Sequence, residues 1–309
     1  MLIRVHAASL NFRDQAILDG QYGAQVKQRC VPLSDGAGEV GAVGSAVVRV
    51  RVGDRVTASC HPTWIGGGPL AEYQENSLGI TSDGWLAEYI LLDENAVVHL
   101  PTYLSYAEAA SLPCAAVTAW TGLNVATPLQ PGHTVLVQGT GGVALFSLQI
   151  ARMFGARVLA ITSSDEKAEK LRSWGAEAVI NYRTFPDWDK KILDLTNGKG
   201  VDKVIDIAGE KTIVRSAAST RKGGVISVVG FTSGFGSGLP PIDVLSRTLT
   251  VTGTAIGPRV DFEALMAAIT QHQIRPVIDG VFPFSAYRDA YRRLESGEHV
   301  GKIIVDVAS

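Results

Sequence analysis

A glycine-rich turn near the middle of the chain carries the clearest chemical signal. The apolar run Val135–Val137 leads into Gly139-Thr140-Gly141-Gly142-Val143-Ala144. In such a pattern the first glycine permits a tight turn, the second lets backbone amides approach a pyrophosphate, and a small third residue lets the next helix pack closely. The helix dipole also favours an anion there. A glycine turn without a ligand is the alternative, but the flanking strand and helix favour a dinucleotide bound by Gly139, Thr140, Gly141, Gly142 and Val143.

The residues about 20 positions further on indicate which dinucleotide binds. An NAD-selective domain usually has a carboxylate there, but this chain has Ala160-Ile161-Thr162-Ser163-Ser164. The hydroxyls of Thr162, Ser163 and Ser164 can donate to a 2′-phosphate, and Lys167 can supply positive charge. We therefore expect NADPH. The alternative is that Lys167 is a solvated helix residue and that Ser164 only caps the helix.

Two further loops are expected beside the same cofactor. Gly209 follows the strand-like run 204–207, and Gly230 and Phe231 follow the run 225–229. Ligands of parallel α/β sheets bind beyond the carboxyl ends of the strands. Small residues there fit close backbone approach, so we add Gly209, Gly230 and Phe231 to the cofactor site.

The composition is that of a globular protein without an evident polyanionic partner. The chain has 309 residues, 46% hydrophobic content and a net charge of -2 from 28 basic and 30 acidic residues. This length suits two domains, and the charge gives no reason to expect nucleic acid or a membrane as partner. No apolar run reaches the roughly 18–20 residues of a spanning helix. Three scattered cysteines, Cys30, Cys60 and Cys114, form no disulfide framework, so we expect a cytoplasmic protein.

The first hundred residues favour β-structure. We expect short strands at 2–5, 38–43, 55–58, 85–92 and 96–99. The alternating segment 47–56 predicts a half-buried hairpin, and the segment 62–82 predicts a long loop. Ser105 and Glu108 form a capping-box pattern for a helix, and a second helix is expected at 115–125.

From residue 134 strands and helices alternate. The strands are apolar on both faces, which predicts an α/β fold with a doubly wound parallel sheet. The predicted strands are 134–138, 157–162, 178–181, 202–207, 224–229 and 248–255, with helices at 142–154, 165–174, 187–195 and 211–219. The strand 248–255 is rich in β-branched residues, and it either pairs with a second subunit in a homodimer or is covered by a loop. The remaining chain predicts helices 260–271 and 285–296, an extended run 276–282 and a strand 302–307.

Short motifs follow one another along the chain in a specific order. Besides the glycine turn they occupy 8–14, 32–40, 52–56, 117–120, 163–167, 174–176, 180–183 and 301–302. Their joint order resembles the medium-chain dehydrogenase/reductase superfamily, and within it the zinc-free quinone oxidoreductase-like and alcohol dehydrogenase-like members.

The resemblance implies a divided domain organisation. Residues 1–125 and 257–309 would form a GroES-like, β-rich catalytic domain, and residues 126–256 an inserted Rossmann dinucleotide-binding domain. Relatives usually carry a strand or two before the equivalent of Leu2, so we expect the catalytic domain to be short at its N-terminus.

The resemblance also bears on a metal. Zinc-dependent relatives hold the ion with a cysteine, a histidine beside a glutamate, and a second cysteine, and keep a fourth position for substrate. At these positions the chain has Asn11, Ser34-Asp35 and Cys114. We therefore expect no metal. A rearranged site with Cys60 and His61 is the alternative.

Several single residues take roles from the resemblance. Asn11 is expected to orient the nicotinamide or polarise a substrate oxygen, unless it is only a hydrogen-bonding residue at a strand end. Tyr22 matches a tyrosine that lines the cleft of relatives, either as proton donor or as an aromatic wall. Lys302 either serves the same cleft or is a surface lysine. Positions near the nicotinamide or the adenosine of relatives correspond to Thr118, Ile256 and Tyr182.

Together these features predict an enzyme that transfers hydride from NADPH to a small-molecule quinone or α,β-unsaturated carbonyl. Without a Lewis acid, this transfer is easiest where a carbonyl already makes the accepting carbon electrophilic. One alternative is an alcohol dehydrogenase-like carbonyl reductase. The other is a nucleotide-binding protein without turnover.

Overall fold

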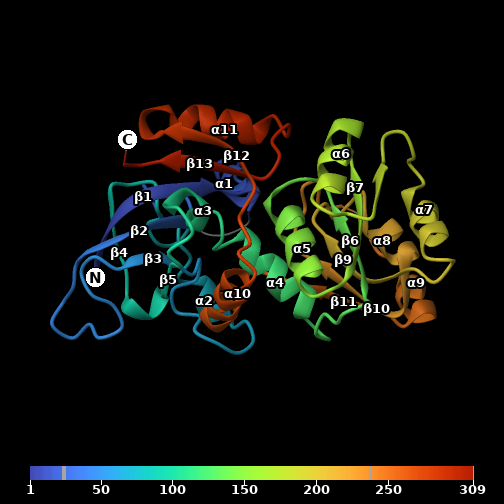
Figure 1. Cartoon of the computed structure of the whole chain (residues 1–309), viewed down its shortest axis with the longest axis horizontal. Helices are drawn as coiled ribbons and strands as arrows, with labels where there is room; N and C mark the ends of the chain where they lie inside the picture. Colours follow the sequence, from blue (N-terminus) through green and yellow to red (C-terminus); the bar gives the residue numbers. More distant parts are fainter. Residues whose placement is uncertain (23–25, 237, 309) are drawn as a thin grey trace. The chain divides into compact units, whose positions relative to one another are not determined.

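The computed structural model describes residues 1–22, 26–236 and 238–308, and the chain divides into two compact units (Figure 1). The first unit comprises Met1–Val117 together with Ile256–Ser309, and the second comprises Thr118–Ala255. The first unit is therefore built from both ends of the chain, and the second from its middle.

The second unit is a six-stranded parallel sheet of the Rossmann type. Its order, β8-β7-β6-β9-β10-β11, places the third, second and first strands on one side of the fourth, fifth and sixth. The predicted alternation is confirmed to within a few residues, because both faces of the strands are buried under helices. The strands are β6 (Thr134–Gln138), β7 (Arg157–Thr162), β8 (Ala178–Asn181), β9 (Val201–Asp206), β10 (Thr220–Val228) and β11 (Thr250–Gly253).

Helices connect these strands. In the second unit α5 packs on β6 and β7, α6 on β7 and β8, and α8 on β9 and β10. α4 begins in the first unit and ends in the second. β11 forms one edge of the sheet, so the expected pairing with a second subunit remains a prediction for that strand. The helices are α4 (Ala115–Asn124), α5 (Gly142–Met153), α6 (Asp165–Ser173), α7 (Trp188–Leu195), α8 (Ile213–Ser219) and α9 (Pro241–Arg247).

The first unit contains a seven-stranded sheet of the GroES-like domain. Its order is β12-β13-β1-β2-β3-β5, and β4 also pairs with β1. β1 and β13 are antiparallel, with Leu10 opposite Ile303, so the first and last strands of the chain lie side by side. The strands are β1 (Leu2–Leu10), β2 (Asp35–Ala42), β3 (Arg55–Ala58), β4 (Tyr89–Leu91), β5 (Val97–His99), β12 (Ile278–Pro283) and β13 (Lys302–Asp306).

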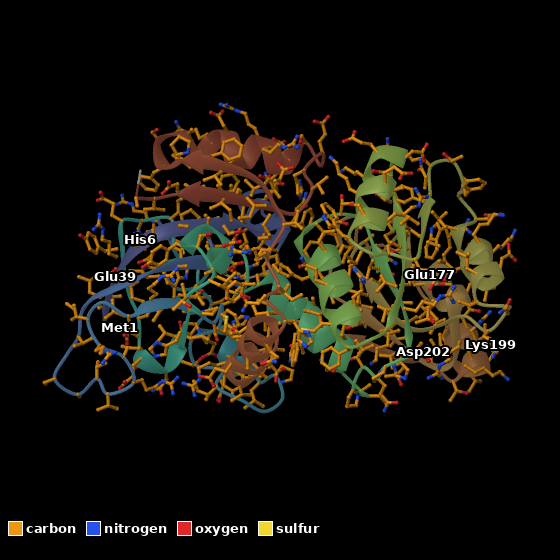
Figure 2. The ribbon with its side chains drawn as sticks, viewed as in Figure 1. Met1, His6, Glu39, Glu177, Lys199 and Asp202 are labelled. Carbon is orange, nitrogen blue, oxygen red and sulfur yellow. The ribbon has the colours of Figure 1, made fainter. Side chains whose placement is uncertain are left out.

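Helices complete the first unit, and most of them are short. The capping box predicted at Ser105 is confirmed, since its hydroxyl accepts from the Glu108 amide at 3.2 Å and the Glu108 carboxylate accepts from the Ser105 amide at 2.8 Å. The helix that it starts, α3, stacks Tyr106 on His6 of β1, with ring centroids 4.1 Å apart (His6 is labelled in Figure 2). The helices are α1 (Phe12–Leu18), α2 (Ala71–Gln74), α3 (Tyr106–Ala110), α10 (Arg259–Gln271), α11 (Tyr287–Glu295), η1 (Glu94–Ala96) and η2 (Phe284–Ala286).

The hairpin predicted at 47–56 is wrong. Only β3, from Arg55, is a strand there, and residues 47–52 follow an irregular path. The Glu94 carboxylate accepts from the backbone amides of Val48 and Arg49, at 2.8 and 2.5 Å, and Asp54 accepts from the amide of Arg51 at 2.9 Å. These side chains take the hydrogen bonds that a partner strand would otherwise satisfy.

Two predicted strands have different lengths in the structure. β1 continues to Leu10 rather than ending at residue 5, and the strand expected at 85–92 is reduced to β4. Trp85 is instead fully buried against Gly36 of β2, where a Cβ atom would lie 2.3 Å from the indole ring. Within the described residues, no helix is both long and apolar enough to cross a membrane.

Candidate functional site

The predicted nucleotide-binding residues of the second unit converge at the carboxyl ends of neighbouring strands. Gln138 pairs with Ile161 and Thr162 pairs with Asn181, so the carboxyl ends of β6, β7 and β8 lie side by side. The segments that follow these strands therefore leave the sheet at the same end. The predicted cofactor residues at this end of the sheet are Gly139, Thr140, Gly141, Gly142, Val143, Thr162, Ser163, Ser164, Lys167 and Tyr182. This is the place where doubly wound sheets bind ligands.

The glycine turn has the backbone geometry that the sequence predicts. Gly139 has φ +79°, a conformation that residues with a Cβ rarely adopt. Gly141 is the N-cap of α5, and an added Cβ would meet nothing within 4 Å, so the backbone there faces open space. No side chain of the described residues caps α5, and Ala144 is fully buried. The first amides of α5 are therefore available to a phosphate.

The segment after β7 has a mixed role. The Ser164 hydroxyl accepts from the Lys167 amide at 3.3 Å, so Ser164 caps α6, and its contact with the cofactor stays a prediction. A capping hydroxyl still has its own proton to donate. Ser163 and Lys167 are half-buried, Thr162 is buried and Tyr182 is exposed. Ser163, Ser164 and Lys167 thus bring hydroxyl and ammonium groups to the carboxyl end of β7, where the 2′-phosphate is expected.

The loops after β9 and β10 pack directly on one another. Gly209 has φ +78°, and a Cβ on Gly230 would lie 2.6 Å from the Ile207 carbonyl oxygen. The Ser233 amide and hydroxyl both donate to the Ala208 carbonyl, at 3.0 and 2.7 Å. Glycine is therefore needed in this pair of loops for close packing. Phe231, in the second loop, stacks on Phe235.

Sequence reasoning missed the residue that shapes these loops. Asp206 is fully buried at the end of β9, and one carboxylate oxygen accepts from the Gly209 amide at 2.9 Å and the Thr212 hydroxyl at 2.8 Å. The other accepts from Ser216 at 2.6 Å and from Gln138 at 3.3 Å. The signal available was an ionisable residue at the end of an apolar strand run.

The two remaining residues predicted to lie near the nicotinamide, Thr118 and Ile256, are buried. Thr118 lies in α4, in the second unit, and Ile256 is the first residue of the returning part of the first unit. Ile256 has φ +63°, which is a strained conformation for a β-branched residue.

The first unit contains a polar cluster that we call the Lys302 cluster: buried Asp35, Cys60 and Lys302 with half-buried Asn11 and Cys114. Asn11 lies between β1 and α1, where its backbone amide donates to Asp14 at 2.7 Å. Its side-chain Oδ1 accepts from Lys302 Nζ at 2.5 Å, and the same ammonium donates to the Leu10 carbonyl at 2.7 Å. Lys302 is 3% exposed, so the alternative of a surface lysine is wrong.

Asp35 is the anion of the Lys302 cluster and is 0% exposed. Its Oδ2 lies 3.7 Å from Lys302 Nζ and accepts from the Cys114 amide at 3.2 Å. Its Oδ1 accepts from the Ser34 hydroxyl at 2.8 Å and from the Cys60 thiol at 3.4 Å. Each carboxylate oxygen thus has two partners from the protein.

Three possible metal ligands also converge in the Lys302 cluster. An Asp35 oxygen and the Sγ atoms of Cys60 and Cys114 all lie within 4.8 Å of one another. Burial raises the pKa of the Cys60 thiol well above its usual value, and its hydrogen bond with Cys114 and the nearby charge of Asp35 add to the shift. His61, which the alternative of a rearranged site pairs with Cys60, places Nδ1 3.1 Å from the Tyr73 carbonyl. The Cys60–His61 alternative therefore does not describe this set of ligands.

Arg13 and Tyr22 form a second polar group near these cysteines. The Arg13 guanidinium carbon lies 5.5 Å from the centre of the Tyr22 ring, and its Nη2 donates to the Ser77 hydroxyl at 3.0 Å. Burial raises the pKa of Tyr22, with Arg13 acting in the opposite direction. A tyrosine that is harder to ionise is a weaker proton donor, which favours the aromatic-wall interpretation of Tyr22.

One atom in the Lys302 cluster is left without a partner. In the described part of the chain, Nδ2 of Asn11 is buried and makes no hydrogen bond. Lys302 has only donors, so the Asn11 amide must present Oδ1 to it and turn Nδ2 away. A buried donor without a partner is unfavourable by about 1–3 kcal/mol unless a ligand satisfies it.

Two family models match the chain. The alcohol dehydrogenase GroES-like domain matches residues 1–102, and the zinc-binding dehydrogenase family matches residues 142–271. A zinc-type alcohol dehydrogenase-like protein of Schizosaccharomyces pombe is 40% identical over 313 residues, which cover 99% of this chain and 90% of that protein. The chain therefore belongs to the medium-chain dehydrogenase/reductase superfamily, as one of its zinc-type alcohol dehydrogenase-like members.

Solved structures have the same fold. A putative alcohol dehydrogenase from Sinorhizobium meliloti 1021 has a TM-score of 0.93 and 37% identity, over 99% of this chain and 90% of that one. A protein described as an NAD-dependent alcohol dehydrogenase has a TM-score of 0.89 and 31% identity, over 99% and 91%. The chain is thus an NAD(P)-dependent oxidoreductase of this family, and these relatives leave its preferred nicotinamide, metal and substrate open.

Proposed function

We propose that this protein is a zinc-independent, NADPH-dependent reductase of quinones or α,β-unsaturated carbonyls. When bound, NADPH supplies the hydride. The protein would contribute a hydrogen-bond donor to the substrate oxygen, on which negative charge develops as hydride arrives. The observation that carries this proposal is the buried, unpartnered Nδ2 of Asn11, held in one orientation by Lys302.

The metal expected from the family name does not fit these residues well. Two positions that hold zinc in zinc-dependent relatives are Asn11 and Ser34, and neither is free to ligate. Asn11 Oδ1 accepts from an ammonium, and the Ser34 hydroxyl donates to Asp35. The remaining set of Asp35, Cys60 and Cys114 already has its carboxylate satisfied by protein donors. The proposed reaction therefore uses no zinc.

The preference for NADPH rests on the second unit. No carboxylate occupies 160–164, and Ser163, Ser164 and Lys167 lie together at the carboxyl end of β7. A 2′-phosphate there would accept hydrogen bonds from the hydroxyls and pair with the lysine ammonium. Tyr182 follows the neighbouring strand β8, on the side expected to face the adenosine.

The test is an acceptor panel run with NADPH and NADH in parallel on protein purified without chelators. We expect oxidation of NADPH with quinones and enones, and no loss of rate after treatment with a chelator. Stoichiometric zinc combined with turnover of simple aldehydes would contradict the proposal and favour an alcohol dehydrogenase, as the name of the NAD-dependent relative suggests. Tight NADPH binding without any turnover would favour a protein that only binds the nucleotide.

A substitution of Asn11 tests its proposed role as a hydrogen-bond donor. Asn11→Ala should lower kcat by about 10²–10³-fold, the usual effect of removing one donor to a developing oxyanion. The Kd of NADPH, measured by nicotinamide fluorescence, should change little. Asn95→Ala removes an exposed asparagine of the same unit and serves as the control. Equal kcat values for the two variants would assign Asn11 to the strand end alone.

A further inference from the structure

Lys302 is an unusual residue for the first position of a strand. Its side chain is 3% exposed, although a lysine normally keeps its ammonium in water. The ammonium has three N–H donors, and two of them are taken by the Leu10 carbonyl and Asn11 Oδ1. Its third neighbour is the Asp35 carboxylate at 3.7 Å. The chain therefore builds a complete anionic and polar shell around one buried positive charge.

The neighbours of the Lys302 ammonium lie at or beside the positions that bind zinc in zinc-dependent relatives. Asn11 stands where zinc-dependent relatives have their first cysteine ligand, and Asp35 follows the position of their histidine ligand. The ammonium therefore contacts one residue at a ligand position and one beside a ligand position. A third ligand position, Cys114, donates its backbone amide to the same carboxylate at 3.2 Å.

We propose that the Lys302 ammonium is the resident cation of this site and takes the place of the zinc ion. This inference rests on the proposed zinc independence and extends it, because it names what replaces the metal. The ammonium neutralises the buried Asp35 carboxylate, as a metal would. It also fixes the Asn11 amide with Nδ2 turned away, so Lys302 is a positioning residue for the donor that would contact substrate.

The proposal has a consequence that does not depend on turnover. Without the ammonium, Asp35 becomes a buried anion that has no ion-pair partner among the described residues, which is an unfavourable arrangement. Asp35, Cys60 and Cys114 would then surround an uncompensated site, with ligand atoms within 4.8 Å of one another. A Zn²⁺ ion could enter as both thiols lose their protons to solvent and all three side chains become ligands.

The experiment is a zinc titration of wild type and Lys302→Ala under reducing conditions, after dialysis against a chelator and then metal-free buffer. Wild type should retain no stoichiometric zinc, whereas Lys302→Ala should bind about one Zn²⁺ per chain. At a hundredfold excess over its Kd, zinc should raise the folded-to-unfolded ratio of the variant about a hundredfold. Co²⁺ should give thiolate-to-metal charge-transfer absorption in the variant only, and Lys302→Ala/Cys114→Ser should lose it.

Lys203 provides a matched control. It is a second buried lysine, 1% exposed, but its ammonium donates to the carbonyls of Val125 and Thr127, at 3.3 and 2.5 Å. Among the described residues it has no carboxylate within salt-bridge distance. Lys203→Ala should therefore lose stability without any response to zinc. Lys302→Arg keeps the positive charge and should exclude zinc as wild type does.

Lys302→Gln covers the case in which the alanine variant does not fold. Glutamine keeps a donor for the Leu10 carbonyl but lacks the charge, and zinc added during expression should raise its soluble yield where Mg²⁺ does not. Equal zinc binding by wild type and Lys302→Ala would overturn the proposal. So would failure of both uncharged variants to respond to zinc. Because no readout uses NADPH oxidation, either result is distinguishable from failure of the acceptor panel.

Discussion

Asp14 and His61 are buried groups of the first unit whose ionisation is linked to folding in opposite directions. Burial raises the pKa of Asp14 to about 6, although Arg13 beside it acts to lower it. Burial lowers the pKa of His61 to about 4, and Arg13 adds to this shift. The folded protein therefore keeps a proton on Asp14 and none on His61 at pH 5, whereas the unfolded chain does the reverse. Shifts of this size correspond to about 3 kcal/mol each.

The signs of the two effects determine what single variants should show. The raised pKa of Asp14 contributes stability below pH 3.8 that is lost as the pH rises to about 6, because the folded state then binds more protons. The lowered pKa of His61 has the opposite sign, and its contribution is lost as the pH falls from 6.5 to about 4. In wild type the two contributions largely offset one another.

We expect opposite pH slopes from Asp14→Asn and His61→Asn in urea unfolding between pH 4 and 6.5. Relative to wild type, His61→Asn should gain about 3 kcal/mol as the pH falls, and Asp14→Asn should lose a similar amount. The exposed His272 supplies the control, since His272→Asn removes a histidine that is not buried. Parallel slopes for the two variants would show that these groups are not linked to folding in this way.

At the scale of elements, the segment that carries Ser34 and Asp35 into β2 is clamped by its neighbours. Leu33 has φ +73° and is fully buried. The Gly84 amide donates to the Val31 carbonyl at 2.7 Å, and the Trp85 amide donates to the Leu33 carbonyl at 2.9 Å. A Cβ on Gly84 would lie 2.1 Å from the Leu33 carbonyl oxygen. The backbone path of residues 31–34, which lead to Asp35, therefore requires a residue without a Cβ atom at position 84.

Gly84→Ala should be strongly destabilising, by about 3 kcal/mol or more, because backbone must move to admit the methyl group. Gly68→Ala is the control, since an added Cβ there meets nothing within 4 Å. Denaturant unfolding of both variants measures the difference. An effect of Gly84→Ala as small as that of Gly68→Ala would mean that the clamp relaxes without cost.

The two units differ in how far the sequence predicts them. Strands β6 to β10 each contain a short apolar run and alternate with helices, and this local pattern is enough to find them. In the first unit the contacts that determine the structure join residues far apart in the sequence. The Glu94 carboxylate accepts hydrogen bonds from the amides of Val48 and Arg49, and Asp35 pairs with Lys302. No local pattern encodes such pairs. The residue types at positions 11 and 114 pointed from the sequence to two members of the Lys302 cluster. The burial of Lys302 could not be predicted in this way, because it follows from the pairing of β1 with β13.

At the scale of the whole molecule, the division into two units predicts two separable responses to ligand. The compound 2′,5′-ADP represents the adenosine end of NADPH without the nicotinamide, and the proposed contacts for that end all lie in the second unit. We expect it to slow amide hydrogen exchange at the N-terminus of α6 and around Tyr182, while β1 and β13 exchange as before. The ligand 5′-ADP, which lacks the 2′-phosphate, should protect α6 less. Equal protection by both ligands would contradict the assignment of Ser163 and Lys167 to the phosphate.

The pairing of β1 with β13 also sets an order of events during synthesis. Chains emerge from the ribosome N-terminus first, and compact units fold as they become complete. Residues Thr118–Ala255 are all synthesised before Lys302. A nascent chain can therefore fold its second unit before Lys302 is available to contact Asn11 and Asp35. We expect the Lys302 cluster to be among the last parts of the protein to form.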